Sequence, residues 1–98
     1  MRYFELATMP DTDAYFAQFT DDATVEDDDN VYHGIDEIRT WRTVVPRVRY
    51  DVTRVEQQGN STHAWVAISG EFPSSPVTLR FEFEYAEGDR ITALRITP

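Results

Sequence analysis

The sequence predicts a single α+β domain in which three helices pack on one face of a curved antiparallel β-sheet. Apolar residues up to Val45 have helical or mixed spacing, whereas from Val48 onward they alternate with polar residues as in strands. Helices that precede a run of strands are typical of the α+β class. The length of 98 residues suits one modest core, so we expect one domain over residues 1–98.

Two short helices are expected at the beginning of the chain. The first covers residues 1–8, and Pro10 interrupts it because proline cannot continue a helix. Asp11 or Thr12 can cap the second helix, which buries Phe16.

A strand, an acidic loop and a third helix are expected next. Residues 23–25 form a short strand that leads into the acidic loop 27–30. Gly34 then opens a helix over residues 35–43, where apolar side chains recur every three or four positions. Pro46 ends it, because a residue before proline resists the helical conformation.

Four strands are expected in the second half, at residues 48–55, 63–70, 77–85 and 90–97. Alternation is clearest in the third of them, whose inward side chains are Val77, Leu79, Phe81, Phe83 and Tyr85.

The composition excludes several classes of function. A net charge of −9 disfavours nucleic acids and anionic membrane surfaces. The chain has no lysine and no cysteine, which removes Schiff-base chemistry, disulfides and thiolate metal sites. No apolar run approaches the roughly 20 residues of a membrane span. We therefore expect a soluble, cytoplasmic protein.

The sequence predicts no metal site. A calcium-binding EF-hand loop from Asp27 would need glycine at Tyr32 and glutamate at Ile38. The two histidines, His33 and His63, lack the spacing of helical metal ligands.

One segment carries a recognisable pattern. It runs FTDDATVED over residues 19–27 and continues as HGIDEI over residues 33–38. This pattern resembles the nuclear transport factor 2-like superfamily, and within it the ketosteroid isomerase and SnoaL-like polyketide cyclase branch. RYFEL at residues 2–6 is similar to the first-helix motif of the bacterial isomerases, and EGDRI at residues 87–91 is similar to their last hairpin. The likeness covers nearly the whole chain.

The resemblance implies a cone, also called a cystatin-like roll, in which a curved sheet of four to six strands wraps around helices and encloses an apolar pocket. It places Asp27 at the position of the isomerases' aspartate base, and Tyr3 at that of the tyrosine that holds the enolate oxygen. Phe81 falls on the position of the second oxyanion donor and cannot donate a hydrogen bond. From the residues alone, Asp27 could equally begin a solvated loop and Tyr3 could be a core residue.

Further residues are candidates for binding a substrate. His33 could lie at the pocket rim, and the candidate wall consists of Tyr15, Phe16, Trp41, Val66, Phe81, Phe83, Leu94 and Ile96. Each could instead be ordinary core. Trp65 and the outward arginines could serve a homodimer through the sheet, the common assembly in this superfamily.

Two functional hypotheses remain open. The first is a cofactor-free isomerase or cyclase that acts on an apolar carbonyl compound, such as a steroid- or polyketide-like ring. The second is a non-catalytic ligand-binding or dimerisation module on the same fold. Neither hypothesis requires a metal or a cofactor.

Overall fold

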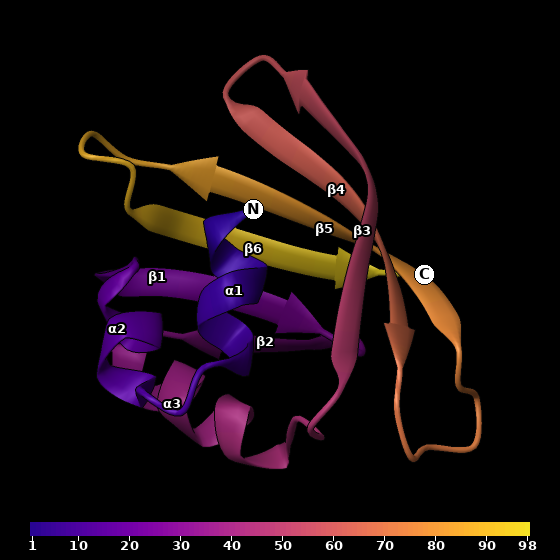
Figure 1. Ribbon diagram of the computed structural model, residues 1–98. Helices are drawn as coiled ribbons and strands as arrows, with labels where there is room; N and C mark the ends of the chain where they lie inside the picture. Colours follow the sequence, from indigo (N-terminus) through magenta and orange to yellow (C-terminus); the bar gives the residue numbers. More distant parts are fainter.

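Three helices and six strands make up the structure, a computed structural model that describes residues 1–98 (Figure 1). The helices are α1 (Arg2–Thr8), α2 (Thr12–Ala17) and α3 (Ile35–Val44). The strands are β1 (Phe19–Asp27), β2 (Asn30–His33), β3 (Arg49–Gln58), β4 (Ser61–Ser69), β5 (Val77–Tyr85) and β6 (Ile91–Thr97). None of the helices is long and apolar enough to cross a membrane.

All six strands belong to one sheet in the order β2-β1-β6-β5-β4-β3. Neighbouring strands are antiparallel except β1 and β6, which run parallel to each other. The predicted α+β fold class and the curved sheet are therefore confirmed, with one parallel contact that the strand pattern did not predict.

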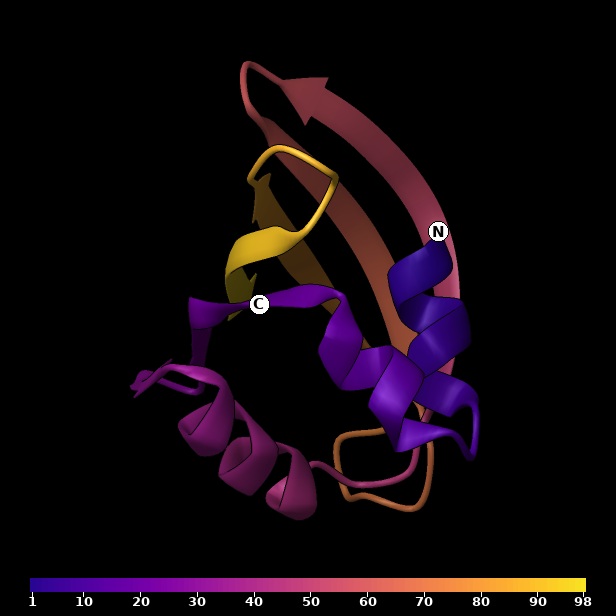
Figure 2. The ribbon, with the colours of Figure 1, turned by 90° about the vertical axis from the view of Figure 1, so that its left-hand side faces the viewer.

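The sheet curves strongly around the helices. Figure 2 shows it as an arc that ends in β3 beside α1, with all three helices on its inner side. Irregular register in β1, in β3 between Val52 and Arg54, and between β5 and β6 interrupts the ladders. Such bulges increase the bend and twist of a strand, so they help the sheet to close into a cone.

The predicted helix boundaries agree with the structure. The carboxylate of Asp11 accepts hydrogen bonds from the backbone N–H groups of Asp13 and Ala14, which caps α2. Gly34 precedes α3 with φ of 85°, a conformation that glycine adopts without strain. The helix ends at Val44, and the extended backbone of the next residue, Val45, suits the proline that follows.

The acidic segment 27–30 is a tight hairpin turn and not the loop expected from its sequence. β1 continues to Asp27 and β2 begins at Asn30, so only Asp28 and Asp29 form the turn. Both have positive φ, 51° and 62°, as in the type I′ turns that connect two-residue hairpins. These turns usually contain asparagine and glycine, so a pair of aspartates concealed the hairpin and the strand β2.

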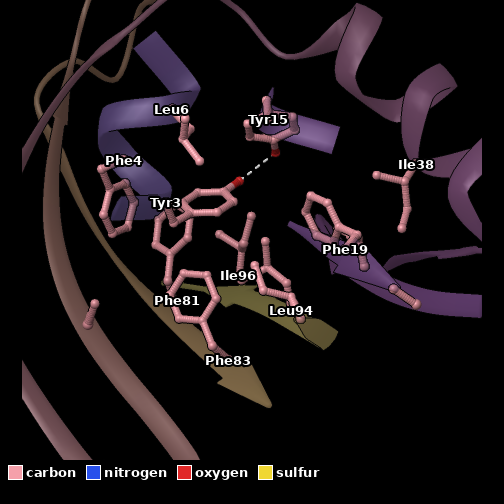
Figure 3. Close-up of a cluster of buried hydrophobic side chains, with 14 of the residues drawn as sticks. Tyr3, Phe4, Leu6, Tyr15, Phe19, Ile38, Phe81, Phe83, Leu94 and Ile96 are labelled. Atoms are coloured by element: carbon pink, nitrogen blue, oxygen red, sulfur yellow. Dashed lines mark hydrogen bonds between the residues drawn. The ribbon is translucent and has the colours of Figure 1, made fainter. Parts of the chain in front are cut away.

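The core lies between the concave face of the sheet and the helices, as Figure 3 shows for its central aromatic cluster. The rings of Tyr3 and Phe83 lie 5.1 Å apart, and those of Phe4 and Phe81 lie 5.0 Å apart. The alternation predicted for β5 places Phe81 and Phe83 inward, as expected. Tyr85, also expected inward, is 36% exposed, because the register shift at Glu84 and Tyr85 disrupts the strand there.

Candidate functional site

A cavity of about 200 Å³ opens at the end of the cone near the C-terminus of α3. The helices α1 and α3 form one side of it, and strands of the sheet form the other. Eleven of its fourteen lining residues are hydrophobic. The lining residues are Tyr3, Asp27, Trp41, Arg42, Val45, Pro46, Val48, Tyr50, Ile68, Phe72, Val77, Leu79, Phe81 and Ile96. This interior suits an apolar ligand oriented by a few polar groups.

Asp27 lies on the cavity wall as the last residue of β1 and is partly buried. Its Oδ2 accepts a hydrogen bond of 3.0 Å from Nε1 of Trp41, a buried residue of α3. No hydrogen bond engages Oδ1 of Asp27, since the indole contact is the only one that the carboxylate makes. The carboxylate is thus fixed through one oxygen, while the other stays free to accept a proton.

Tyr3 and Tyr15 form a buried pair of hydroxyls, 2.7 Å apart (Figure 3). Burial raises the pKa of Tyr3 well above its usual value, and the neighbouring Tyr15 adds to the effect. Burial also raises the pKa of Tyr15 to about 12, against the opposing influence of Arg42. Both phenols are therefore protonated near neutral pH, so each can donate a hydrogen bond.

Arg42 is the one cationic residue of the cavity wall. Its Nη2 donates a hydrogen bond of 3.0 Å to the carbonyl oxygen of Ala7, at the C-terminal end of α1. Its guanidinium carbon lies 4.4 Å from the centre of the Tyr15 ring. Burial alone would lower the pKa of Arg42, but the nearby tyrosine hydroxyls outweigh burial and raise it. The side chain is therefore a fixed and permanent cation.

The described residues hold no cluster of three or more histidine, cysteine or acidic side chains arranged to bind a metal ion. The polar side chains of the cavity wall are the carboxylate of Asp27, the phenols of Tyr3 and Tyr50, the indole of Trp41 and the guanidinium of Arg42.

No family model matches the chain, and no curated protein matches it. Solved structures, in contrast, do match the chain. An NTF2-like protein of unknown function from Cytophaga hutchinsonii is 13% identical, with a TM-score of 0.79 over 96% of this chain and 80% of that one. A ketosteroid isomerase-like protein from Catenulispora acidiphila is 16% identical, with a TM-score of 0.77 over 98% of this chain and 81% of that one. These two likenesses concern the fold alone.

A third structure, a candidate polyketide cyclase from Sinorhizobium meliloti, is 31% identical and has a TM-score of 0.89. The alignment covers 97% of this chain and 89% of that chain. The chain belongs to the nuclear transport factor 2-like superfamily. Within that superfamily, its structural neighbours are ketosteroid isomerase-like proteins and polyketide cyclases.

The superfamily cone brings five of the candidate residues together at the cavity: Tyr3, Asp27, Trp41, Phe81 and Ile96. The ring centres of Tyr3 and Phe81 are 6.1 Å apart, so the residue at the second donor position does face the cavity but presents only an aromatic surface.

The other candidates do not line this cavity. Five are core residues, Tyr15, Phe16, Val66, Phe83 and Leu94. His33 is exposed, and its backbone N–H donates to the carboxylate of Glu37 at the start of α3. The reason is that the cavity opens beside the C-terminus of α3, whereas the five core side chains pack within the main hydrophobic cluster and His33 lies on β2.

Much of the wall comes from segments in which the sequence predicted no site residue. The connection from α3 to β3 contributes Val45, Pro46 and Val48, and the segment between β4 and β5 contributes Phe72. Arg42 could have been noticed, because it follows Ile38 by four positions and so shares the apolar face of α3. The connecting segments gave no comparable signal.

Proposed function

We propose that the cavity binds a small apolar carbonyl compound and that the protein transfers a proton at the carbon beside the carbonyl. The observation that carries this proposal is that Asp27 and Tyr3 line the same mostly hydrophobic cavity. A carboxylate at the edge of an apolar space is a suitable base, and a neutral phenol is a suitable donor to an enolate oxygen.

In the proposed reaction, Oδ1 of Asp27 takes a proton from the carbon next to the carbonyl. The electron pair of that C–H bond moves into an enolate, whose oxygen accepts a hydrogen bond from Tyr3. An isomerase would return the proton from Asp27 to a different carbon. A cyclase would let the enolate carbon attack a second carbonyl of the same molecule, and the resulting alkoxide would take up the proton.

The pair of tyrosine hydroxyls supports Tyr3 as the donor to the enolate oxygen when Tyr15 donates the hydrogen bond between them. Tyr3 can donate to a ligand only when Tyr15 donates to Tyr3, and the 2.7 Å separation accommodates either direction. In that arrangement Tyr15 orients the Tyr3 hydroxyl and strengthens it as a donor, as expected for linked hydrogen bonds in a low-dielectric interior.

Two features bear on the substrate and the rate. Phe81 offers no hydrogen bond, and the loss of one preorganised donor typically costs about 3 kcal/mol, or roughly 100- to 1000-fold in rate. The volume of about 200 Å³ lies below the roughly 300–1,000 Å³ of most ligand pockets, which favours one ring over a four-ring steroid.

The alternative is a non-catalytic binding module, and Phe81 at the donor position is the observation that favours it. The two functions differ in the role of Asp27. An enzyme loses its turnover when Asp27 becomes Asn, whereas a binding module keeps its affinity for the ligand.

Exchange of α-protons for deuterium tests the proposal without knowledge of the natural substrate. A cyclic enone would be incubated with the protein in D₂O and its signals followed by NMR. We expect exchange that is lost in Asp27→Asn and retained in Asp28→Asn, a control that makes the same charge change at the next residue, which is exposed and not on the wall. Loss of exchange in both variants would contradict a specific role for Asp27.

Binding of 4-nitrophenol, a rigid mimic of an enolate, separates the two functions. Binding that Tyr3→Phe weakens, without any exchange by the wild type, would favour the binding module. Failure of both the exchange and the binding in a folded protein would overturn the proposed cavity function.

We also propose that the protein forms a homodimer through the outer face of the sheet. Trp65 points away from the core, and its ring lies 4.6 Å from the guanidinium of Arg54. A large aromatic residue amid arginines on an open sheet face is typical of the centre of a protein interface.

A further inference from the structure

The cation in the cavity wall defines the ligand more closely. We infer that Arg42 binds a carboxylate of the ligand, so that the cavity takes a small ring compound that carries an acid group beside its reactive carbonyl. The inference rests on the proposed function, which places the ligand in this cavity, and adds the charge and the orientation of that ligand.

The first argument is that Arg42 has no ion-pair partner. The ion pairs of the structure join Arg49 to Asp51, Arg54 to Glu56 and Arg95 to Glu26, and His63 forms a fourth with Glu82 when its imidazole is protonated. Only three of the nine arginines take part in these pairs, so what distinguishes Arg42 is that it is unpaired, partly buried and on the wall of a cavity. Buried charges in proteins are usually paired. A partly buried and unpaired guanidinium on the wall of a cavity is therefore available to an anion that enters from outside.

The second argument is that Arg42 is held ready to bind. The hydrogen bond from Nη2 to Ala7 fixes one corner of the guanidinium, and the Tyr15 ring lies against the group. The Ala7 carbonyl accepts one of the five N–H donors of the guanidinium, and Tyr50 is a second hydrogen-bond partner that helps to raise the pKa of Arg42, so further donors stay free for a ligand. A planar fork whose orientation is already fixed matches a carboxylate, because two parallel N–H donors face its two oxygens.

The third argument concerns the surroundings. The mostly hydrophobic wall strengthens the attraction between Arg42 and an anion, because little water competes there. The protein as a whole has a net charge of −9 and repels anions, so an anionic ligand needs a local cation in order to bind.

Arg42 and Asp27 lie on the same wall without forming an ion pair with each other. A ligand anchored at Arg42 by its carboxylate would thus reach Asp27 with another part of its ring. The two charges would orient the ligand with its acid group at α3 and its reactive carbon at the end of β1.

A purely structural role would also use the contacts to Ala7 and Tyr15, since Arg42 joins α3 to both shorter helices. That role predicts no preference for anions. The two roles therefore differ in how the cavity discriminates between a charged ligand and a neutral ligand of the same shape.

Benzoate and benzamide are such a pair of probes. Trp41 lies on the cavity wall, so its fluorescence can report binding in a Trp65→Phe background that leaves Trp41 as the only tryptophan. We expect benzoate to bind about tenfold or more tightly than benzamide, as a charged hydrogen-bonded pair implies. Equal affinities for the two probes would overturn the inference, and this measurement needs no change at Arg42.

The variant Arg42→Gln should abolish the preference for benzoate over benzamide, because it removes the positive charge. Arg42→Lys should retain part of the preference for benzoate, because lysine keeps the positive charge but lacks the parallel N–H donors of the guanidinium. The matched control is Arg39→Gln, since Arg39 is an exposed arginine of α3 that lies 4.4 Å from the Phe16 ring and does not line the cavity. A preference for benzoate that survives in Arg42→Gln would also overturn the inference.

Failure of this inference is distinguishable from failure of the proposed function. Binding of 4-nitrophenol that depends on Tyr3, together with equal affinities for benzoate and benzamide, would remove the carboxylate and keep the proposed function. No binding of any of the three probes would overturn both.

Discussion

The indole of Trp41 holds one oxygen of Asp27 at 3.0 Å and leaves the other without a partner. This makes Trp41 a positioning residue for the proposed base. Trp41→Phe keeps an aromatic ring and deletes the donor, so the deuterium exchange rate should fall about tenfold, which corresponds to one hydrogen bond to a charged group. The affinity for 4-nitrophenol should change little. Trp65→Phe, on the outer face, is the control, and an exchange rate unchanged in Trp41→Phe would contradict the positioning role.

The buried hydroxyls of Tyr3 and Tyr15 link stability to alkaline pH. Because burial raises both pKa values, the folded state keeps these phenols protonated after unfolded tyrosines have begun to ionise near pH 10. The free energy of unfolding should be steady below about pH 10 and fall above it, by up to about 1.4 kcal/mol per pH unit for each tyrosine. Urea unfolding at several pH values measures the slope. Tyr15→Phe should make it shallower, and an unchanged slope would contradict this assignment.

For single residues, the sequence identified members of the cavity wall better than it identified the contacts between them. Asp27 and Tyr3 were singled out from their likeness to the isomerases, and both line the cavity. The bond between Trp41 and Asp27, and the position of Arg42 above Tyr15, join residues far apart in the chain. Such pairs depend on how α3 crosses β1 and α2, and nothing in the local spacing of a sequence encodes that crossing.

Among the elements, the β1–β2 hairpin is held by an unfavourable turn. Asp28 and Asp29 both adopt the left-handed region, which costs an ordinary residue about 1–2 kcal/mol and glycine almost nothing. Asp29→Gly should therefore stabilise the protein by about 0.5–1 kcal/mol and also reduce repulsion among three consecutive acids. Chemical denaturation measures the change. Glu87→Gly, a loss of the same charge outside this turn, is the control, and an equal gain there would assign the effect to charge alone.

The predicted elements succeeded where a local signal was strong and failed where it was weak. Strict alternation of apolar and polar residues predicted β5, and capping residues and prolines predicted the ends of the helices. β2 has only four residues, and the turn before it lacks glycine, so no sequence pattern predicted this strand. β3 was expected over residues 48–55 but extends to Gln58, with a bulge after Val52 that shifts its alternation. A bulge changes the register between two strands, but no particular residue type in the sequence marks its position.

For the molecule as a whole, the two faces of the sheet have different characters. The concave face holds the core, whereas the outer face carries a grid of charges around Trp65. Arg54 and Arg80 are the cross-strand neighbours of Trp65, and Glu82 lies between His63 and Arg95 in the strand pairing. Such a face can remain in water or pair with a second copy, so the cone alone does not fix the assembly.

The proposed homodimer predicts a mass near twice the 11.4 kDa of one chain in sedimentation experiments at several concentrations. Trp65→Glu should shift the protein to monomer, because it replaces the apolar centre of the face with a charge that pairing would bury. The fold should survive, since the new carboxylate lies between Arg54 and Arg80 and can pair with either. Val44→Glu, at an exposed position of α3, introduces the same charge away from the sheet and should leave the dimer intact. A monomeric wild type would contradict the homodimer. A dimer that Val44→Glu disrupts and Trp65→Glu does not would place the interface away from the sheet.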